Sequence, residues 1–323
     1  MSLRPLSGAD PKSAILSRGP LWQLPGISGT GLIVMAAMGF GLNPLFARLL
    51  IADGLGAEMI SLYRFIIPAV LLCWALRVAP ALRPEVGRML LLGAGNGVAI
   101  FGYFYALEVI PAASVIVIYY TYPVFSVIVG WLLFGRMPGG NTIVAALLIA
   151  VAASLAVRPE GLSAGQGLAL AGSFLAPLMI ALQIQYLSAP RLDMKPLSRI
   201  AWGSLGHLLV LIPLVVWLAP VRLLPQSDIA VMATLGIAIA AAVLPQLLFI
   251  VGAARCQPER TAVAGALELI VAMCCGALLL GDSLGRLEIT AVVLILMALF
   301  IRDSESLSIA GQDPAGNLSA PER

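Results

Sequence analysis

Charged residues are scarce in this chain. Only 11% of its 323 residues are Asp, Glu, Lys or Arg, whereas a soluble domain carries about 25%. Hydrophobic residues make up 60% of the sequence, and the mean hydropathy is +1.01. The formal net charge of +3 is too small to indicate a nucleic-acid partner. Together these values predict an integral membrane protein that exposes apolar side chains to lipid.

Residues that commonly catalyse reactions or bind metals are also few. The chain has one histidine, His207, and four cysteines, and none of them forms a spacing typical of metal ligands. It has no Walker-type phosphate loop, so ATP is not the expected energy source. We therefore expect no cofactor, no bound metal and no enzyme active site. One enzyme alternative stays open, because His207 and Glu268 together could act on a lipid-linked substrate within the membrane.

The sequence also lacks the features of a removable signal peptide. The first 26 residues contain no short apolar stretch followed by a small-residue cleavage site. We therefore expect residues 1–26 to form an N-terminal tail, and the first apolar run to be a retained helix. The polar residues 303–323 are expected to form a C-terminal tail.

Long apolar runs, by contrast, fill most of the chain. A helix needs about 20 apolar residues to cross the hydrocarbon core. Charges, prolines and glycines divide the chain into ten such runs, so the expected fold is all-α with ten transmembrane helices. These runs lie near residues 30–51, 59–78, 88–107, 112–134, 141–157, 167–188, 198–219, 229–252, 261–280 and 287–302. Most of the lysines and arginines fall on one side of this arrangement, which predicts that both termini are cytoplasmic.

The two halves of the chain resemble each other. The segment YTYPVFSVIVGWLLFGR (120–136) aligns with LELIVAMCCGALLLGD (267–282). Each half holds five predicted helices, an odd number, so the second half must enter the membrane in the opposite sense. Inverted repeats of this kind are typical of secondary transporters. Their binding site usually lies near the midplane between the repeats, which rock to expose it to either side.

This pattern resembles the drug/metabolite transporter superfamily, in particular its EamA-type members, over roughly residues 30–302. The matching motif is an apolar helix that closes on a Leu-Gly-acid step, seen as LLFGR (132–136) and LLLGD (278–282). The second copy keeps the acid as Asp282, whereas the first has Arg136. The family often shows Leu-Glu-Pro early in the ninth helix, and here the proline is replaced by Leu269.

The resemblance implies two EamA-like repeats of five helices each, at residues 27–158 and 166–302. It also implies an inner-membrane exporter of small organic solutes such as amino acids, metabolites or drugs. The expected partners are therefore a small-molecule substrate and membrane lipid, while the substrate itself and the oligomeric state stay open. A passive channel is a further alternative, but the sequence has no charged ring or repeated filter loop.

Glu268 is a carboxylate within the apolar run 262–282. An ionised acid at the centre of a bilayer costs roughly 2.5–3.5 kcal/mol on insertion scales. Its neighbours three and four residues away, such as Ala264 and Gly265, are small. We expect Glu268 to face a cavity, where it would bind a substrate ammonium group or carry a proton. The alternative is a buried acid that fixes helix packing.

Tyrosines cluster before and within the aligned segment of the first half. Tyr119 and Tyr122 are three residues apart and share one helix face. We expect them to line the cavity, where their rings could stack on a flat substrate and their hydroxyls form hydrogen bonds. Tyr103 and Tyr105 lie near the end of a predicted helix, so they are expected to belong to an interfacial belt.

Other polar side chains inside the predicted helices are also cavity candidates. Asn43 and Gln246 each lie next to a proline, and proline frees backbone carbonyls within a membrane helix, so these stretches could line a cavity. The alternative for each is interhelical hydrogen bonding, worth about 0.6 kcal/mol per contact. The amide candidates are Asn43, Asn96, Gln183 and Gln246.

Two basic side chains also lie within predicted helices. His207 is expected near the midplane, where it would either take part in proton coupling or form a packing hydrogen bond. Arg64 lies near the outer end of the second predicted helix, so we expect it to snorkel to the interface. An anion site in the outer vestibule is the alternative for Arg64.

Overall fold

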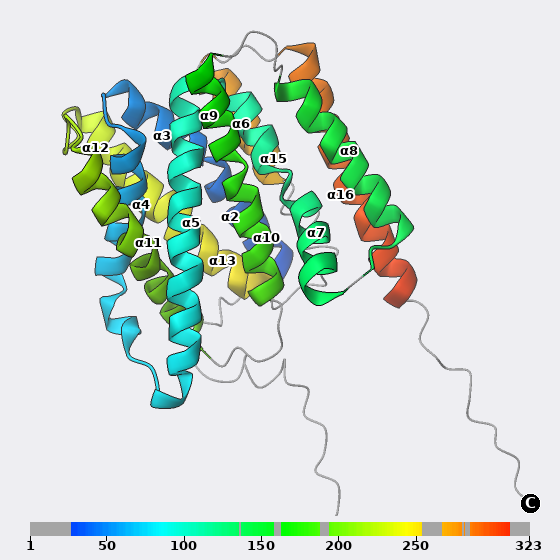
Figure 1. Cartoon of the computed structure of the whole chain (residues 1–323), viewed down its shortest axis with the longest axis horizontal. Coiled ribbons are helices and arrows are strands. Elements are labelled where there is room, and N and C mark those ends of the chain that lie inside the picture. Colours follow the sequence, from blue (N-terminus) through cyan, green and yellow to red (C-terminus); the bar gives the residue numbers. More distant parts are fainter. Residues whose placement is uncertain are drawn as a thin grey trace, which may run out of the picture.

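The computed structural model describes residues 27–135, 137–157, 163–187, 194–253, 267–279, 281 and 285–310. Every regular element in these ranges is a helix (Figure 1). The first half contains α2 (Gly29–Gly41), α3 (Asn43–Ala52), α4 (Ala57–Leu71), η2 (Cys73–Leu76), η3 (Pro80–Leu82), α5 (Arg83–Val109), α6 (Ala112–Tyr119), α7 (Tyr122–Phe134) and α8 (Gly140–Val157). The second half contains α9 (Ala164–Ser173), α10 (Leu175–Leu187), α11 (Pro196–Leu218), α12 (Asp228–Leu235), η4 (Gly236–Val243), α13 (Leu244–Ala253), α15 (Leu267–Leu279) and α16 (Arg286–Ala310).

Each range expected from the sequence overlaps at least one of these helices. Among the described residues, six helical segments are long and apolar enough to cross a membrane, and three shorter helices are also apolar. The six are Gly29–Ala52, Pro80–Val109, Ala112–Leu133, Gly165–Gln183, Pro196–Leu218 and Asp228–Phe249. Large apolar side chains such as Leu91, Leu168 and Val216 are exposed on the surface, as expected where helices face lipid rather than water. Helix α16 runs beyond the expected end at 302, so it includes the first part of the predicted tail.

Local signals account for several helix boundaries. The Ser28 hydroxyl accepts a hydrogen bond from the backbone N–H of Gly31, 3.1 Å away, and so caps the start of α2. Ser163 and Gln166 form a capping box at the start of α9. Gly135 ends α7 in the left-handed conformation, with φ of 63°, which glycine adopts without steric cost.

Four of the expected helices are interrupted close to a proline. Helix α2 ends before α3, α6 before α7, and α9 before α10, while the π-helical η4 leads into α13. Pro44, Pro123, Pro177 and Pro245 each lie within the first three residues after these breaks. Proline has no N–H and its ring clashes with the carbonyl four residues earlier, so it breaks or kinks a helix. The sequence predicted irregular backbone at Pro44 and Pro245, but continuous helices at the other two positions.

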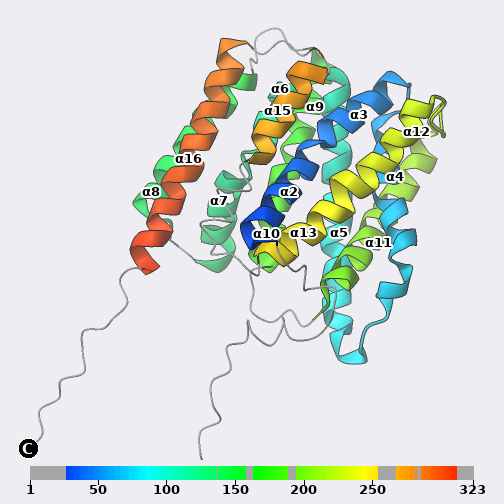
Figure 2. The same cartoon turned by 180° about the vertical axis from the view of Figure 1, so that it is seen from behind.

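The two halves interleave in the bundle. Helix α11 of the second half packs against α4 and α5 of the first, and α13 packs against α2. Helices α8 and α16, which close the two halves, lie side by side at one edge in both views (Figures 1 and 2). Helix α2 begins and α16 ends on the same side of the bundle (Figure 1). Each half is therefore stabilised by contacts with the other.

The packing of α5 on α11 depends on small residues. A Cβ atom on Gly206 would stand 2.9 Å from the Cα of Gly93, which is too close for any real side chain. Glycines at both positions let the two backbones approach, as at many helix contacts in membranes. This contact sets the distance between polar side chains further along the two helices.

The turn between α3 and α4 is joined to the α11–α12 connection of the other half. The Asp53 carboxylate accepts hydrogen bonds from the backbone N–H of Gln226, at 2.8 Å, and of Ser227, at 3.2 Å. Arg222 Nη1 donates to the Asp53 carbonyl at 2.5 Å, and the Tyr63 hydroxyl donates to a carbonyl of the same connection at 2.5 Å. Hydrogen bonds therefore link the two halves at this end of the bundle.

Candidate functional site

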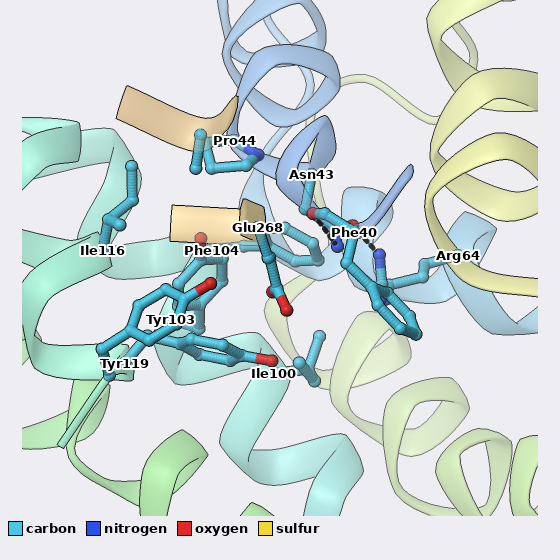
Figure 3. A pocket seen from close by; sticks show the side chains of 12 residues that line it. Phe40, Asn43, Pro44, Arg64, Ile100, Tyr103, Phe104, Ile116, Tyr119 and Glu268 are labelled. Carbon is cyan, nitrogen blue, oxygen red and sulfur yellow. Dashed lines mark hydrogen bonds between the residues drawn. The ribbon is translucent and has the colours of Figure 1, made fainter. Parts of the chain in front are cut away.

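A small cavity lies where broken helices of both halves meet (Figure 3). Its volume is about 30 Å³, and one water needs roughly 10–15 Å³ on this measure. Organic ligands occupy pockets of about 300–1,000 Å³, so an organic solute would fit only if the helices moved apart. The cavity is lined by Phe40, Asn43, Pro44, Arg64, Ile100, Tyr103, Phe104, Ile116, Tyr119, Tyr120, Glu268 and Ala272.

Asn43 connects two helix breaks from different halves of the chain. Its Nδ2 donates to the carbonyl of Phe40, at 2.9 Å, and to the carbonyl of Ala241, at 3.2 Å. These carbonyls are four residues before Pro44 and Pro245, which have no N–H to complete an α-helical hydrogen bond to them. One amide group therefore satisfies the carbonyls that two prolines leave free.

The oxygen of the same amide positions a buried arginine. Arg64 Nη1 donates a hydrogen bond to Asn43 Oδ1, and Arg64 is only 9% exposed. Its Nε is buried without a hydrogen-bond partner. Its Cζ lies 5.7 Å from the ring centroid of Phe65, within cation–π range. The expectation that Arg64 snorkels to the interface is therefore wrong, because Asn43 holds its side chain at the cavity wall.

Glu268 lies on the opposite side of the cavity. It is the second residue of α15 and is half-buried. In Figure 3 its side chain points into the space between two tyrosine rings and the Arg64 side chain. Helix α2 comes close here, since a Cβ on Gly41 would stand 2.9 Å from the Glu268 carbonyl oxygen. In the described part of the chain, no ion pair joins the Glu268 carboxylate to the Arg64 guanidinium.

Aromatic rings form a third wall. The ring centroids of Tyr103 and Tyr119 are 5.5 Å apart, and those of Tyr119 and Tyr120 are 5.6 Å apart. The Tyr120 hydroxyl is buried without a hydrogen-bond partner of standard geometry, although it lies next to the Glu268 carboxylate. Unpaired buried polar atoms are rare in native structures. Tyr120 and Arg64 each contribute one to the lining of this cavity.

Three of the candidates predicted from the sequence, Asn43, Tyr119 and Glu268, line this cavity together. Tyr122 does not line it, but its ring centroid lies 6.2 Å from that of Tyr120. Gln183 is half-buried on α10 and Gln246 is exposed on α13, and neither lines the cavity.

His207 and Asn96 bind each other between α11 and α5, outside the cavity lining. Asn96 Nδ2 lies 2.8 Å from His207 Nε2, and His207 Nδ1 lies 2.5 Å from the Gly203 carbonyl. A carbonyl only accepts, so Nδ1 carries the proton and Nε2 accepts from the Asn96 amide. The imidazole also stacks on Phe65, with ring centroids 3.6 Å apart. This arrangement agrees with the packing alternative stated for both residues.

Arg64, Tyr103 and Tyr120 line the cavity but were not among the cavity candidates from the sequence, which offered for Arg64 only an anion site in the outer vestibule as the alternative. Tyr103 is 6% exposed and lines the cavity, so its assignment to an interfacial belt is wrong. Position along a helix gave the depth of these side chains but not the face on which they lie. For Arg64, the one available signal was the Asn43-Pro44 pair in the preceding predicted helix, because an amide next to a carbonyl freed by proline indicates a polar region.

The structure offers no support for the enzyme alternative. Within the described ranges, no cluster of three or more His, Cys, Asp and Glu side chains could hold a metal ion. His207 and Glu268 do not line one cavity, and both imidazole nitrogens of His207 are engaged. A His–acid pair acting on one substrate is therefore absent from the described part of the chain.

Comparison with known proteins agrees with this architecture. One solved structure aligns with a TM-score of 0.62 and 13% sequence identity, covering 88% of this chain and 99% of that chain, which shows a shared fold. No curated protein matches the sequence. The model of the EamA-like transporter family matches residues 27–158 and, separately, residues 166–302. The chain therefore contains two copies of this unit and belongs to the EamA-like transporter family.

Proposed function

We propose that this protein is a secondary transporter that moves small organic solutes through the central cavity by alternating access. The observation that carries the proposal is the cavity itself, where a buried arginine and tyrosines of the first half meet the Glu268 carboxylate of the second half close to breaks in the helices. In membrane proteins, ionisable residues within the spans usually face substrate or ion pathways. Irregular backbone at membrane depth is tolerated where it lines such a cavity.

The proposed topology has ten membrane-spanning helices in two inverted repeats of five, with both termini in the cytoplasm. The proposed location is the inner membrane and the proposed net direction is export. The two separate matches to the family model support the repeats, and the start of α2 and the end of α16 on the same side of the bundle (Figure 1) support termini on one side of the membrane. The small volume of the cavity supports a conformational cycle, because solute enters only when the helices around Glu268 and Arg64 separate.

Counterflow in proteoliposomes tests this function. Vesicles holding the purified protein are preloaded with an unlabelled solute, and uptake of the labelled solute is followed for a panel of amino acids and drugs. We expect saturable uptake that falls at least about tenfold in Glu268→Gln, since a charged partner contributes about 1.5–3 kcal/mol. Glu85→Gln is the control, because Glu85 pairs with Arg88 at the far end of α5.

Other outcomes would contradict transport. Conversion of a lipid-linked substrate without a gradient would favour an enzyme, and single-channel currents would favour a passive pore. Absence of counterflow for every member of the panel would also count against the proposal.

A further inference from the structure

A second cavity lies between helices at one side of the bundle. Its volume is about 400 Å³, within the range of about 300–1,000 Å³ that organic ligands occupy. It shares no lining residue with the central cavity. The space is therefore large enough for a ligand and separate from the proposed solute site. It is lined by Thr121, Val124, Phe125, Ala150, Ala153, Ser154 and Phe174.

The cavity lies where small side chains of α8 meet two helix breaks. Ala150, Ala153 and Ser154 contribute little side-chain volume from α8. Thr121 lies at the break between α6 and α7, and Phe174 lies at the break between α9 and α10. Helix α7 lies between α8 and α10 in both views and packs against both (Figures 1 and 2). Small residues beside broken helices thus leave a space that side chains do not fill.

The lining offers no free hydroxyl proton to a polar ligand. Thr121 Oγ1 donates to the Ile118 carbonyl at 2.6 Å, and Ser154 Oγ donates to the Ala150 carbonyl at 2.9 Å. The other five lining side chains are apolar. A buried water needs about two to four polar partners, so this cavity suits an apolar occupant better than water.

The mouth of the cavity lies on the surface that faces lipid. Ala150 and Ser154 are exposed, and so are the neighbouring apolar side chains Leu147 and Val151 of the same helix. In a protein of this membrane family, the medium outside such a surface is the acyl chains of the bilayer. The cavity is therefore continuous with a reservoir of flexible apolar chains.

The interior of the cavity gives an acyl chain a surface to pack on. Phe125 and Phe174 are half-buried, with ring centroids 6.4 Å apart. An empty space of this size would deprive both rings of dispersion contacts that a filled one provides. We propose that one acyl chain of a bilayer phospholipid inserts between α7, α8 and α10 and occupies this cavity.

The inserted chain contacts the same helix break that serves the central cavity. Thr121 lines the lipid cavity, and the preceding residue, Tyr120, lines the central one. The break between α6 and α7 therefore contributes to the walls of both. A chain packed against Thr121 supports the backbone that carries Tyr119 and Tyr120.

Photo-crosslinking in bilayers tests the site on the wild-type protein. The purified protein is reconstituted with a phosphatidylcholine that carries a diazirine in the middle of one acyl chain, illuminated, and digested for peptide mass spectrometry. We expect adducts on Val124, Phe125 and Phe174. Adducts on Leu91 of α5 and Val216 of α11, which are exposed elsewhere on the bundle, report ordinary lipid contact. Adducts on these two residues with none in the cavity would overturn the proposal.

Filling the cavity from α8 tests whether the adducts depend on this space. Ala150→Phe places a ring at the mouth and should lower the adduct yield on Phe125 and Phe174 about tenfold or more, while the yield on Leu91 stays unchanged. Val144→Phe is the control, because Val144 is exposed on α8 outside the cavity lining and its variant should leave all yields unchanged. Equal cavity yields in wild type and Ala150→Phe would overturn the proposal.

The apolar lining implies that the chain, and not the headgroup, is recognised. Phosphatidylcholine, phosphatidylglycerol and phosphatidylethanolamine with the same diazirine chain should label the cavity to similar extents. Labelling by one headgroup alone would overturn the assignment to an acyl chain. Labelling by a free diazirine-bearing alkane, but by none of the phospholipids, would show that the occupant is a free apolar solute and would also overturn it.

Failure of this inference is distinguishable from failure of the proposed function, because none of these measurements depends on transport. Thermal unfolding of each variant in detergent identifies a variant that fails to fold. The wild-type comparison of cavity and surface adducts, and the comparison of headgroups, need no variant at all.

Discussion

Asn43 donates a hydrogen bond to the carbonyl of Ala241, 3.2 Å away, and so joins segments nearly 200 positions apart. The contact exists because Pro245 has no N–H to offer that carbonyl. The same amide satisfies the Phe40 carbonyl, which Pro44 leaves free, and holds Arg64. The Asn43 side chain thus links a helix break in the first half, a helix break in the second half and the buried Arg64 guanidinium.

Asn43→Leu should lower the stability of the protein by about 1–3 kcal/mol, because buried carbonyls lose their donor. Thermal or denaturant unfolding in detergent measures the change. Pro245→Ala returns a backbone N–H that the Ala241 carbonyl can accept, so Asn43→Leu should cost less in that background. Asn141→Leu, at an exposed position in α8, is the control. Equal costs in both backgrounds would contradict the link between Asn43 and the proline break.

Tyr120→Phe should leave stability unchanged or raise it slightly while transport falls. The Tyr120 hydroxyl is buried without a hydrogen-bond partner of standard geometry, so its removal relieves a desolvation cost that no well-formed hydrogen bond offsets. Transport should fall because the hydroxyl lies next to the Glu268 carboxylate in the cavity. Unfolding temperature and counterflow are measured on the same preparation. Tyr105→Phe, on a ring outside the cavity lining, is the control. A loss of stability without loss of transport would show that the hydroxyl has only a structural role.

The helical framework could be predicted because apolar runs and punctuating prolines set it locally. The cavity positions of Asn43, Tyr119 and Glu268 could also be predicted, since a polar group within an apolar membrane helix needs a partner or a cavity. The burial of Arg64 could not be predicted, because a side chain at its depth in the helix could also have reached the membrane interface. Its inward direction depends on Asn43, which lies on another helix.

The breaks after α6 and α9 show a second limit of sequence reasoning. Pro123 and Pro177 lie in apolar stretches that read as uninterrupted spans. Whether proline kinks a membrane helix or separates it into two depends on which neighbours satisfy the freed carbonyls. Those neighbours come from distant parts of the chain, so local pattern alone does not specify the outcome.

His207 and Asn96 should behave as a coupled structural pair. Each single substitution, His207→Leu or Asn96→Leu, removes the same contact between α11 and α5. The double variant should therefore lose less stability than the sum of the two, by about 0.6 kcal/mol and at most about 1.7. Additive losses, or a changed solute preference in His207→Leu with stability intact, would assign His207 to the transport pathway instead.

Asp53 should make stability depend on pH at the end of the bundle where α3 stops. Backbone hydrogen bonds from Gln226, with help from Ser227 and the nearby Arg222 charge, lower the pKa of the Asp53 carboxyl below its usual value of 3.8. A carboxylate with a lowered pKa in the folded state stabilises the fold above its unfolded pKa, and this contribution is lost as pH falls through the folded pKa. The unfolding temperature of Asp53→Asn should therefore lie below that of wild type at pH 7, and the two should converge below about pH 4. Glu85→Gln is the control, because it removes a carboxylate from the first turn of α5, away from this connection, where Glu85 pairs with Arg88. A constant difference between Asp53→Asn and wild type at every pH would show that the ionised carboxylate is not what joins the two halves.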